Sequence, residues 1–189
     1  MHALRAPVAF DGHAFLPGGA TVVVEGDSIL GLEAFGYDVP HDCPVTTYDG
    51  TLLPGLIDAH VHLVSDGGIG SLERAGTLSD DELDAVIVQS LRQQAAAGVT
   101  TVRDLGDARF RTLTHRDRRE PGLPRIVAAG PPLTVPEGHC HYLGGVVDGP
   151  DPIRAAVRER ADRGVDVVKV MASGGMITLG TDVFGVQFS

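Results

Sequence analysis

Two histidines and an aspartate alternate along an apolar run in "LLPGLIDAHVHL", residues 52–63. Successive side chains of a strand point to opposite faces, so Asp58, His60 and His62 are expected to share one face. Unpaired polar groups beside an apolar interior are costly, and imidazole is a common metal ligand. The stretch therefore predicts a strand that offers two nitrogens to one metal ion. Two solvated or hydrogen-bonded histidines at a strand end would also explain a bare His-x-His pair.

The second candidate is Lys169, in "DVVKVMASGG". It lies at the end of an apolar, β-branched segment, where loss of water disfavours the ammonium form and lowers the pKa of a lysine. A neutral amine can take up carbon dioxide as a carbamate, whose two oxygens can bridge two metal ions. Two other readings stay open: a lysine that extends its amine to water, and a Schiff-base lysine, which would leave the histidine pair unexplained.

The loop "VPEGHCHYLGG", residues 135–145, is rich in groups that could contact a ligand. It follows an expected barrel strand, and active sites gather at that end of such strands. We interpret His139 and Tyr142 as substrate contacts, although unspecialised loop residues would look the same. Adjacent His-Cys-His residues cannot easily converge on one ion, so a separate zinc site is disfavoured. Cys140 is interpreted as an inert small residue, and Asp104 as a polar group at the end of another strand.

The order of the expected elements changes at Pro54. Before it, "ATVVVEGDSILGL" predicts a β-hairpin that turns at Glu25-Gly26-Asp27, and no helical period is present. After it, strands are expected at 56–62, 99–104, 125–129 and 165–170. Helices are expected at 79–98, with Ser79 and Glu82 as a capping box and Gly98 at the end, and at 151–164, with Asp151 as cap, Pro152 in the first position and Gly164 at the end.

Strands that alternate with helices favour a parallel sheet. No glycine-rich nucleotide fingerprint follows the first strand, which leaves a (β/α)-barrel. A complete barrel needs about 250 residues and eight strands, and this chain has room for four. The predicted fold is therefore α/β: a β-sandwich portion over residues 1–53, followed over residues 54–189 by the first four units of a partial (β/α)8 (TIM) barrel.

Composition narrows the class of protein. The 189 residues are 43% hydrophobic and 21% charged, with a formal net charge of −10, so nucleic-acid and anionic-membrane partners are disfavoured. The N-terminus has no apolar core of signal-peptide length. Two cysteines are too few for a disulfide framework. A cytoplasmic protein without a membrane or nucleic-acid partner is expected.

At "PGLIDAHVHL" the chain resembles the amidohydrolase superfamily of metal-dependent hydrolases, and the β-rich lead-in is similar to the small sandwich that precedes the barrel there. The resemblance runs along essentially the whole chain, as an N-terminal half. It implies that His60 and His62 are ligands of the more buried metal. It further implies that a carbamate on Lys169 bridges two divalent metal ions, expected to be zinc, and that Asp58 orients a histidine without binding metal.

The resemblance also implies an activity. The nearest-looking members are Xaa-Pro dipeptidases and imidazolonepropionase-like enzymes, so the expected reaction is hydrolysis of an amide, peptide or cyclic amide C–N bond by a metal-activated water. Two further histidines and the general-base aspartate of the family would lie beyond Ser189. The fragment alone is expected to be inactive and to need the C-terminal half or to self-associate. The alternative is a non-catalytic metal-binding or interaction half-barrel that needs a partner chain.

Overall fold

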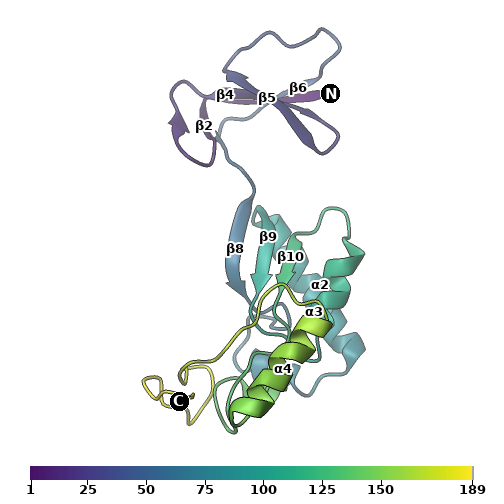
Figure 1. Ribbon diagram of the computed structural model, residues 1–189. Coiled ribbons are helices and arrows are strands. Elements are labelled where there is room, and N and C mark those ends of the chain that lie inside the picture. Colours follow the sequence, from purple (N-terminus) through teal and green to yellow (C-terminus); the bar gives the residue numbers. More distant parts are fainter. Residues whose placement is uncertain (189) are drawn as a thin grey trace. The chain divides into compact units, whose positions relative to one another are not determined.

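The computed structural model describes residues 1–188, and the chain divides into two compact units, Met1–Gly55 and Leu56–Ser189 (Figure 1). Each unit has its own sheets and its own cluster of buried apolar side chains. The units are described separately below, because the candidate chemistry lies entirely in the second.

The first unit contains two sheets and, throughout residues 1–55, no helix. One sheet has the order β5-β4-β1-β6, and the other has the order β3-β2-β7. The strands are β1 His2–Ala6, β2 Val8–Phe10, β3 Phe15–Leu16, β4 Ala20–Glu25, β5 Ser28–Ala34, β6 Val45–Thr47 and β7 Thr51–Leu52. The antiparallel pair β4–β5 is the predicted hairpin, and Gly26 takes the positive φ of 59° that its turn requires.

The second unit is built on a three-stranded parallel sheet in the order β10-β9-β8 (Figure 1). Its strands are β8 Leu56–Val61, β9 Val99–Asp104 and β10 Arg125–Ala128. Both pairings, β8 with β9 and β9 with β10, are parallel, which confirms the first three strands expected after Pro54 and their parallel order. All three carboxyl ends therefore meet at one edge of the sheet, where the loops carrying the candidate residues begin.

The helices of this unit are α1 Ser71–Ala75, α2 Asp80–Ala96, α3 Arg111–Arg118 and α4 Pro150–Asp162, with a short 3-10 turn, η1, at His141–Leu143. Helix α2 has both predicted ends. The Ser79 hydroxyl accepts from the Glu82 backbone N–H, and the Glu82 carboxylate accepts from the Ser79 N–H at 2.8 Å. Gly98 then takes a φ of 84°. Leu83, Ile87 and Leu91 form its buried stripe.

Helix α4 departs from expectation at its start. Gly149 occupies the N-cap position and the helix begins at Pro150, so the prediction that Asp151 caps it is wrong. The Asp151 carboxylate instead accepts from Arg154 at 2.8 Å, one turn further along. Gly164, with a φ of 74°, follows the helix as expected.

The fourth predicted strand, at 165–170, is also wrong, because the segment makes only one bridge, Leu133 to Val170. The chain does run beside the continuation of β10: the Asp166 N–H donates to Ala128 O and the Leu133 N–H donates to Lys169 O. Between those contacts lie Pro131 and Pro132, which have no N–H to donate. The ladder therefore cannot be continuous there.

A single core joins the sheet, the helices and the loops of the second unit. Its buried members are Leu63, Val64, Leu72, Ala75, Leu83, Ile87, Leu91, Val102, Ala108, Leu113, Ile126, Ala128, Cys140, Leu143 and Met171. The core thus reaches from α2 into the loop after β10, and it holds that loop against the carboxyl edge of the sheet. In residues 1–188, no helix is both long enough and apolar enough to cross a membrane.

Candidate functional site

His60 and His62 lie side by side at the carboxyl end of β8. The centroids of their rings are 5.5 Å apart and the ring planes are inclined at 59°. His60 is the more exposed ring, whereas His62 is half-buried beneath it. The structure thus brings together the two imidazoles whose spacing suggested a metal ligand pair.

The backbone of the loop after β9 fixes the tautomer of His62. Its Nδ1 lies 2.9 Å from the carbonyl oxygen of Gly106. A carbonyl can only accept a hydrogen bond, so Nδ1 carries the proton and the lone pair is on Nε2. This is the arrangement that metal-binding histidines use, with one nitrogen held by a backbone carbonyl and the other free to bind.

Asp58 makes its contact with the backbone. Its Oδ1 accepts from the His60 N–H at 3.1 Å, and Gly106 rather than Asp58 holds the neighbouring His62 ring. A role for Asp58 towards a metal-bound histidine therefore stays a prediction. The partner that the sequence reasoning missed is Gly106, and the only local signal for it was a glycine two residues after the end of β9.

Asp104 is fully buried and ties the ends of β8 and β9 together. Its two oxygens accept from the Leu63 N–H at 2.7 Å and from the Gly106 N–H at 2.9 Å. Burial raises the pKa of Asp104 to about 6 despite these bonds. Asp104 thus holds Leu63, which follows His62 in the chain, and Gly106, whose carbonyl binds the His62 ring. Through these two contacts it helps to fix the position of that imidazole.

Asp107 is a second buried carboxyl close to Asp104. Its Oδ2 accepts from the backbone N–H and the hydroxyl of Thr112, at 2.8 and 2.6 Å, whereas its Oδ1 has no hydrogen-bond partner among the described residues. Burial, with the added repulsion of Asp104, raises the pKa of Asp107 to about 7. The two carboxyls form an acidic pair beneath the loop that supports His62.

Lys169 lies on the same side as the histidines. Its charge, after the larger effect of burial, lowers the pKa of both His60 and His62. Its carbonyl accepts from Leu133, so the backbone at this point is anchored to the segment that follows β10. The structure therefore places an amine near the pair, while its conversion to a carbamate stays a prediction.

His139 and Tyr142 converge on one hydroxyl that the sequence reasoning did not identify. The Oγ1 of Thr178 lies 2.9 Å from His139 Nδ1 and 3.2 Å from the Tyr142 hydroxyl. Burial raises the pKa of Tyr142 to about 12 and also raises that of the neighbouring Cys140 thiol, which is fully buried. A buried thiol of this kind is inert, as expected for Cys140.

The donor set fits a metal ion in chemistry but is incomplete in number. Burial lowers the pKa of both His60 and His62, which favours the neutral imidazole that a metal requires. Across residues 1–188, however, no three histidine, cysteine, aspartate or glutamate side chains lie close enough to hold an ion. Zinc sites usually need at least three protein ligands, so His60 and His62 alone do not complete one.

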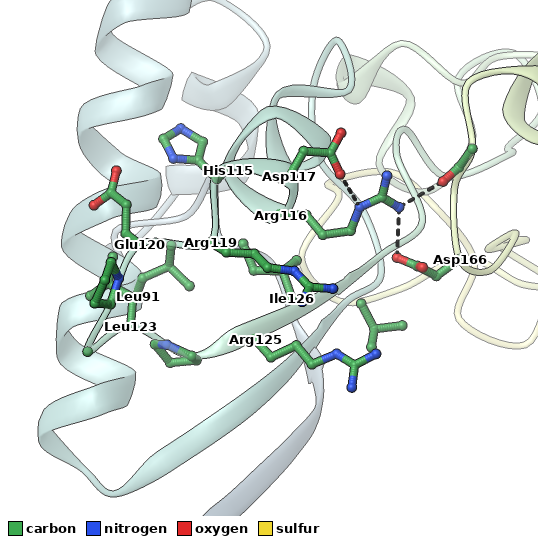
Figure 2. Close-up of a pocket in the computed structure, with 15 residues that line it drawn as sticks. Leu91, His115, Arg116, Asp117, Arg119, Glu120, Leu123, Arg125, Ile126 and Asp166 are labelled. Atoms are coloured by element: carbon green, nitrogen blue, oxygen red, sulfur yellow. Dashed lines mark hydrogen bonds and ion pairs between the residues drawn. The ribbon is translucent and has the colours of Figure 1, made fainter. Parts of the chain in front are cut away.

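A cavity of about 600 Å³ lies at the other end of the sheet. It is lined by the end of α3, the segment leading into β10, and Asp166 (Figure 2). Arg116 reaches between Asp117, at 2.9 Å, and Asp166, at 3.0 Å. Because these residues precede the strands and the histidines follow them, the cavity and the candidate site occupy opposite edges of a parallel sheet.

Comparison with known proteins identifies related chains. The Amidohydrolase family matches residues 51–189. Uncharacterized proteins of Mycobacterium bovis and Mycobacterium tuberculosis are 33% identical over 127 residues, which is 67% of this chain and 30% of theirs. An amidohydrolase crystal structure is 28% identical with a TM-score of 0.83, and covers all of this chain and 50% of its own.

Two further solved structures carry more specific names. A prolidase complexed with N-methylphosphonate-L-proline is 26% identical, with a TM-score of 0.82 over all of this chain and 50% of its own. A Xaa-Pro dipeptidase with bound methionine in its active site is 24% identical, with a TM-score of 0.84 over all of this chain and 51% of its own. The chain thus spans about half the length of these structures and less than a third of the curated relatives.

Proposed function

Since the chain belongs to the amidohydrolase family, we propose that it forms the first half of a (β/α)8 barrel whose complete form is a metal-dependent hydrolase of C–N bonds. Three parallel strands with helices between them, together with neighbours of which the chain covers about half, support this assignment. The parallel sheet does not extend to a regular fourth strand, because Pro131 and Pro132, after β10, interrupt the ladder with the segment that leads to Lys169.

The observation that carries the proposal is the pairing of His60 and His62, with Nε2 of His62 left free by the bond from Nδ1 to Gly106. These two imidazoles would be ligands of a divalent metal, which we propose to be zinc. A bound divalent metal lowers the pKa of water towards 7 and polarises a carbonyl. Lys169, as a carbamate, would supply the third protein ligand and a bridge to a second ion.

The protein's own residues would have two further roles. Asp104 and Gly106 hold His62 in one tautomer and one orientation. His139 and Tyr142, which both contact the hydroxyl of Thr178, would contact the substrate. The charges of His62 and Lys169 both lower the pKa of His139, after the larger effect of burial, which places that ring on the side of the ligand pair.

We propose a substrate with an amide or peptide C–N bond, of dipeptide size, or a cyclic amide. The prolidase whose structure contains a phosphonate derivative of proline supports the dipeptide class, because it is similar along the whole of this chain. Among residues 1–188, no aspartate forms a group of three metal-binding side chains with His60 and His62, so we assign the general base to none of these residues. That role would fall to the part of the barrel that this chain does not contain.

The exposed edge of strand β8 suggests that a further segment of polypeptide packs beside it. The β8 strand is hydrogen-bonded only to β9, and it exposes 48% of Leu56 and 71% of Ile57. Beside this edge, a groove of about 450 Å³ runs between Leu63 and helix α2. We propose that the remaining barrel strands, or a second copy of the chain, cover this edge.

The incomplete set of metal donors favours one alternative function: a half-barrel that binds metal without catalysing a reaction.

Zinc titration of the chain by calorimetry tests the metal site. His60→Ala and His62→Ala should each weaken binding at least about tenfold, because each removes a ligand. His13→Ala, an exposed histidine in the first unit, is the matched control. If the two ligand variants bind zinc like the control, the assignment is wrong.

Hydrolysis of a dipeptide ending in proline, measured before and after the missing half is added, separates the two functions. Turnover that appears only in the complementary mixture and is lost in His60→Ala supports the hydrolase. Zinc binding without turnover in that mixture supports the non-catalytic half-barrel.

A further inference from the structure

Thr178 lies in the segment after residue 173, and only 3% of its surface is exposed. Its hydroxyl is the meeting point of three groups from the loop after β10. The backbone N–H of Cys140 donates to Oγ1 at 3.0 Å, His139 Nδ1 lies 2.9 Å away, and the Tyr142 hydroxyl lies 3.2 Å away. One buried oxygen thus holds two side chains and the backbone between them.

Counting hydrogens assigns a direction to each bond. A threonine hydroxyl has one proton to donate and two lone pairs to accept with. The Cys140 N–H can only donate, so it takes one lone pair. If the Tyr142 hydroxyl donates to the second, the single proton of Thr178 must go to His139 Nδ1. The His139 proton is then on Nε2.

The competing arrangement is weaker. It would turn the Tyr142 hydroxyl towards the Cys140 sulfur, 3.8 Å away, and let Thr178 donate to the tyrosine and accept from a protonated His139 Nδ1. Sulfur is a poor acceptor, and 3.8 Å is a long contact. The arrangement that keeps both phenol and hydroxyl protons on oxygen and nitrogen acceptors is therefore favoured.

The His139 ring is confined from its other side as well. A Cβ atom on Gly175 would come within 2.4 Å of Cε1 and 2.5 Å of Nε2, so the ring lies directly against the backbone of that glycine. The His139 N–H donates to the side-chain oxygen of Gln187 at 2.7 Å when that amide is oriented to satisfy both of its ends. Rotation of the imidazole is thus restricted by two segments that follow Lys169.

We propose that Thr178 is a positioning residue that fixes His139 in the tautomer with its proton on Nε2, so that the ring offers a hydrogen-bond donor at that nitrogen. The inference rests on the proposed function for its use, because such a donor suits the oxygen of an acyl or carboxylate group of a substrate. The tautomer itself is a property of this chain alone.

The test is a long-range proton–nitrogen NMR correlation of the uniformly ¹⁵N-labelled chain at pH 8. His139→Gln identifies the signals of His139 by their loss. We expect Nδ1 of His139 to be unprotonated and Nε2 to carry the proton in the wild type. A protonated Nδ1 would overturn the proposal without any need for a variant.

Three variants test whether Thr178 is responsible. Thr178→Val keeps the shape but removes the hydroxyl, and we expect the His139 signals to shift to the average of two tautomers. Thr178→Ser should restore the wild-type pattern. Thr100→Val, at an exposed threonine in β9, is the control for the substitution itself. A Thr178→Val spectrum identical to that of the control would show that another group sets the tautomer.

The outcome is separable from that of the zinc titration. Failure of zinc to bind at His60 and His62 would remove the proposed function and leave the His139 tautomer unaffected. A wrong tautomer with intact zinc binding would remove only the role of Thr178.

Discussion

The imidazole of His62 and the carbonyl of Gly106 are joined by a 2.9 Å hydrogen bond across 44 residues of sequence. A side chain at position 106 would crowd this contact, because a Cβ atom there would lie 3.1 Å from both Cε1 and Nδ1 of the ring and 3.2 Å from Pro132. The carbonyl can approach His62 because no side chain intervenes.

Gly106→Ala should therefore push the His62 ring away from its partner. Supporting contacts of this kind typically change metal affinity by about 10- to 100-fold, so zinc should bind more weakly by roughly that factor in calorimetry. Gly50→Ala is the matched control, because nothing lies within 4 Å of the added carbon there. Equal zinc affinity in the two variants would show that the Gly106 contact does not prepare the site.

The buried pair Asp104 and Asp107 gives a prediction about pH. The pKa values, raised to about 6 and about 7, mean that the folded chain holds protons that the unfolded chain has lost. The stability that these protons contribute is fully present below pH 3.8, and it is lost as the pH rises through 6 and 7. We expect this pair to make the free energy of unfolding fall between about pH 5 and pH 8.

Asp107→Asn should flatten that dependence, since the amide does not ionise. Urea unfolding at pH 5 and pH 8 measures the difference, with Asp162→Asn, an exposed aspartate at the end of α4, as the control. The prediction fails if Asp107→Asn loses as much stability between the two pH values as the control does.

The carbamate can be tested with unusual selectivity, because Lys169 is the only lysine in the chain. With zinc and ¹³C-labelled bicarbonate, NMR should show one carbamate carbon from a side chain, and Lys169→Gln should remove it. Acetylation of the N-terminal amine serves as the control for the other reactive amine. A signal that survives in Lys169→Gln and disappears on acetylation would place the carbamate at the N-terminus.

Local sequence patterns correctly predicted the features that depend on residues close in sequence. The capping box at Ser79 and the turn at Gly26 involve residues close in sequence, and both were predicted correctly. The fourth strand was not, because its β-branched residues were read without the partner segment, where Pro131 and Pro132 remove the donors that a ladder needs. Sequence periodicity describes one strand at a time, whereas a ladder depends on two.

The site was predictable to a similar extent. The His-x-His spacing identified the pair that the structure brings together. Gly106 and Thr178 were missed because their partners, His62 and His139, lie 44 and 39 residues away, and nothing in either residue's neighbourhood marks the contact. The roles of a single glycine after a strand and of a single threonine in a glycine-rich segment depend on tertiary contacts, which the local sequence does not reveal.

The last prediction concerns the open edge of β8. A strand with unpaired N–H and C=O groups recruits other chains, and Ile57 on this strand is 71% exposed. We expect the chain to self-associate in size-exclusion chromatography with light scattering, and to hydrolyse no proline dipeptide with added zinc. General-base catalysis is usually worth about 10² to 10⁴ in rate, and the proposed function assigns that role to none of the residues in this chain.

Ile57→Lys should shift the chain towards the monomer, because a charged side chain on an edge strand opposes pairing with another strand. Ile69→Lys is the matched control, since Ile69 is fully exposed in the loop before α1 and outside the sheet. If only Ile57→Lys is monomeric, the edge of β8 is the surface that associates. A monomeric wild type would mean that this edge is already protected, and association of both variants would place the contact elsewhere, for which the exposed Met176 and Phe184 after Lys169 are the next residues to substitute.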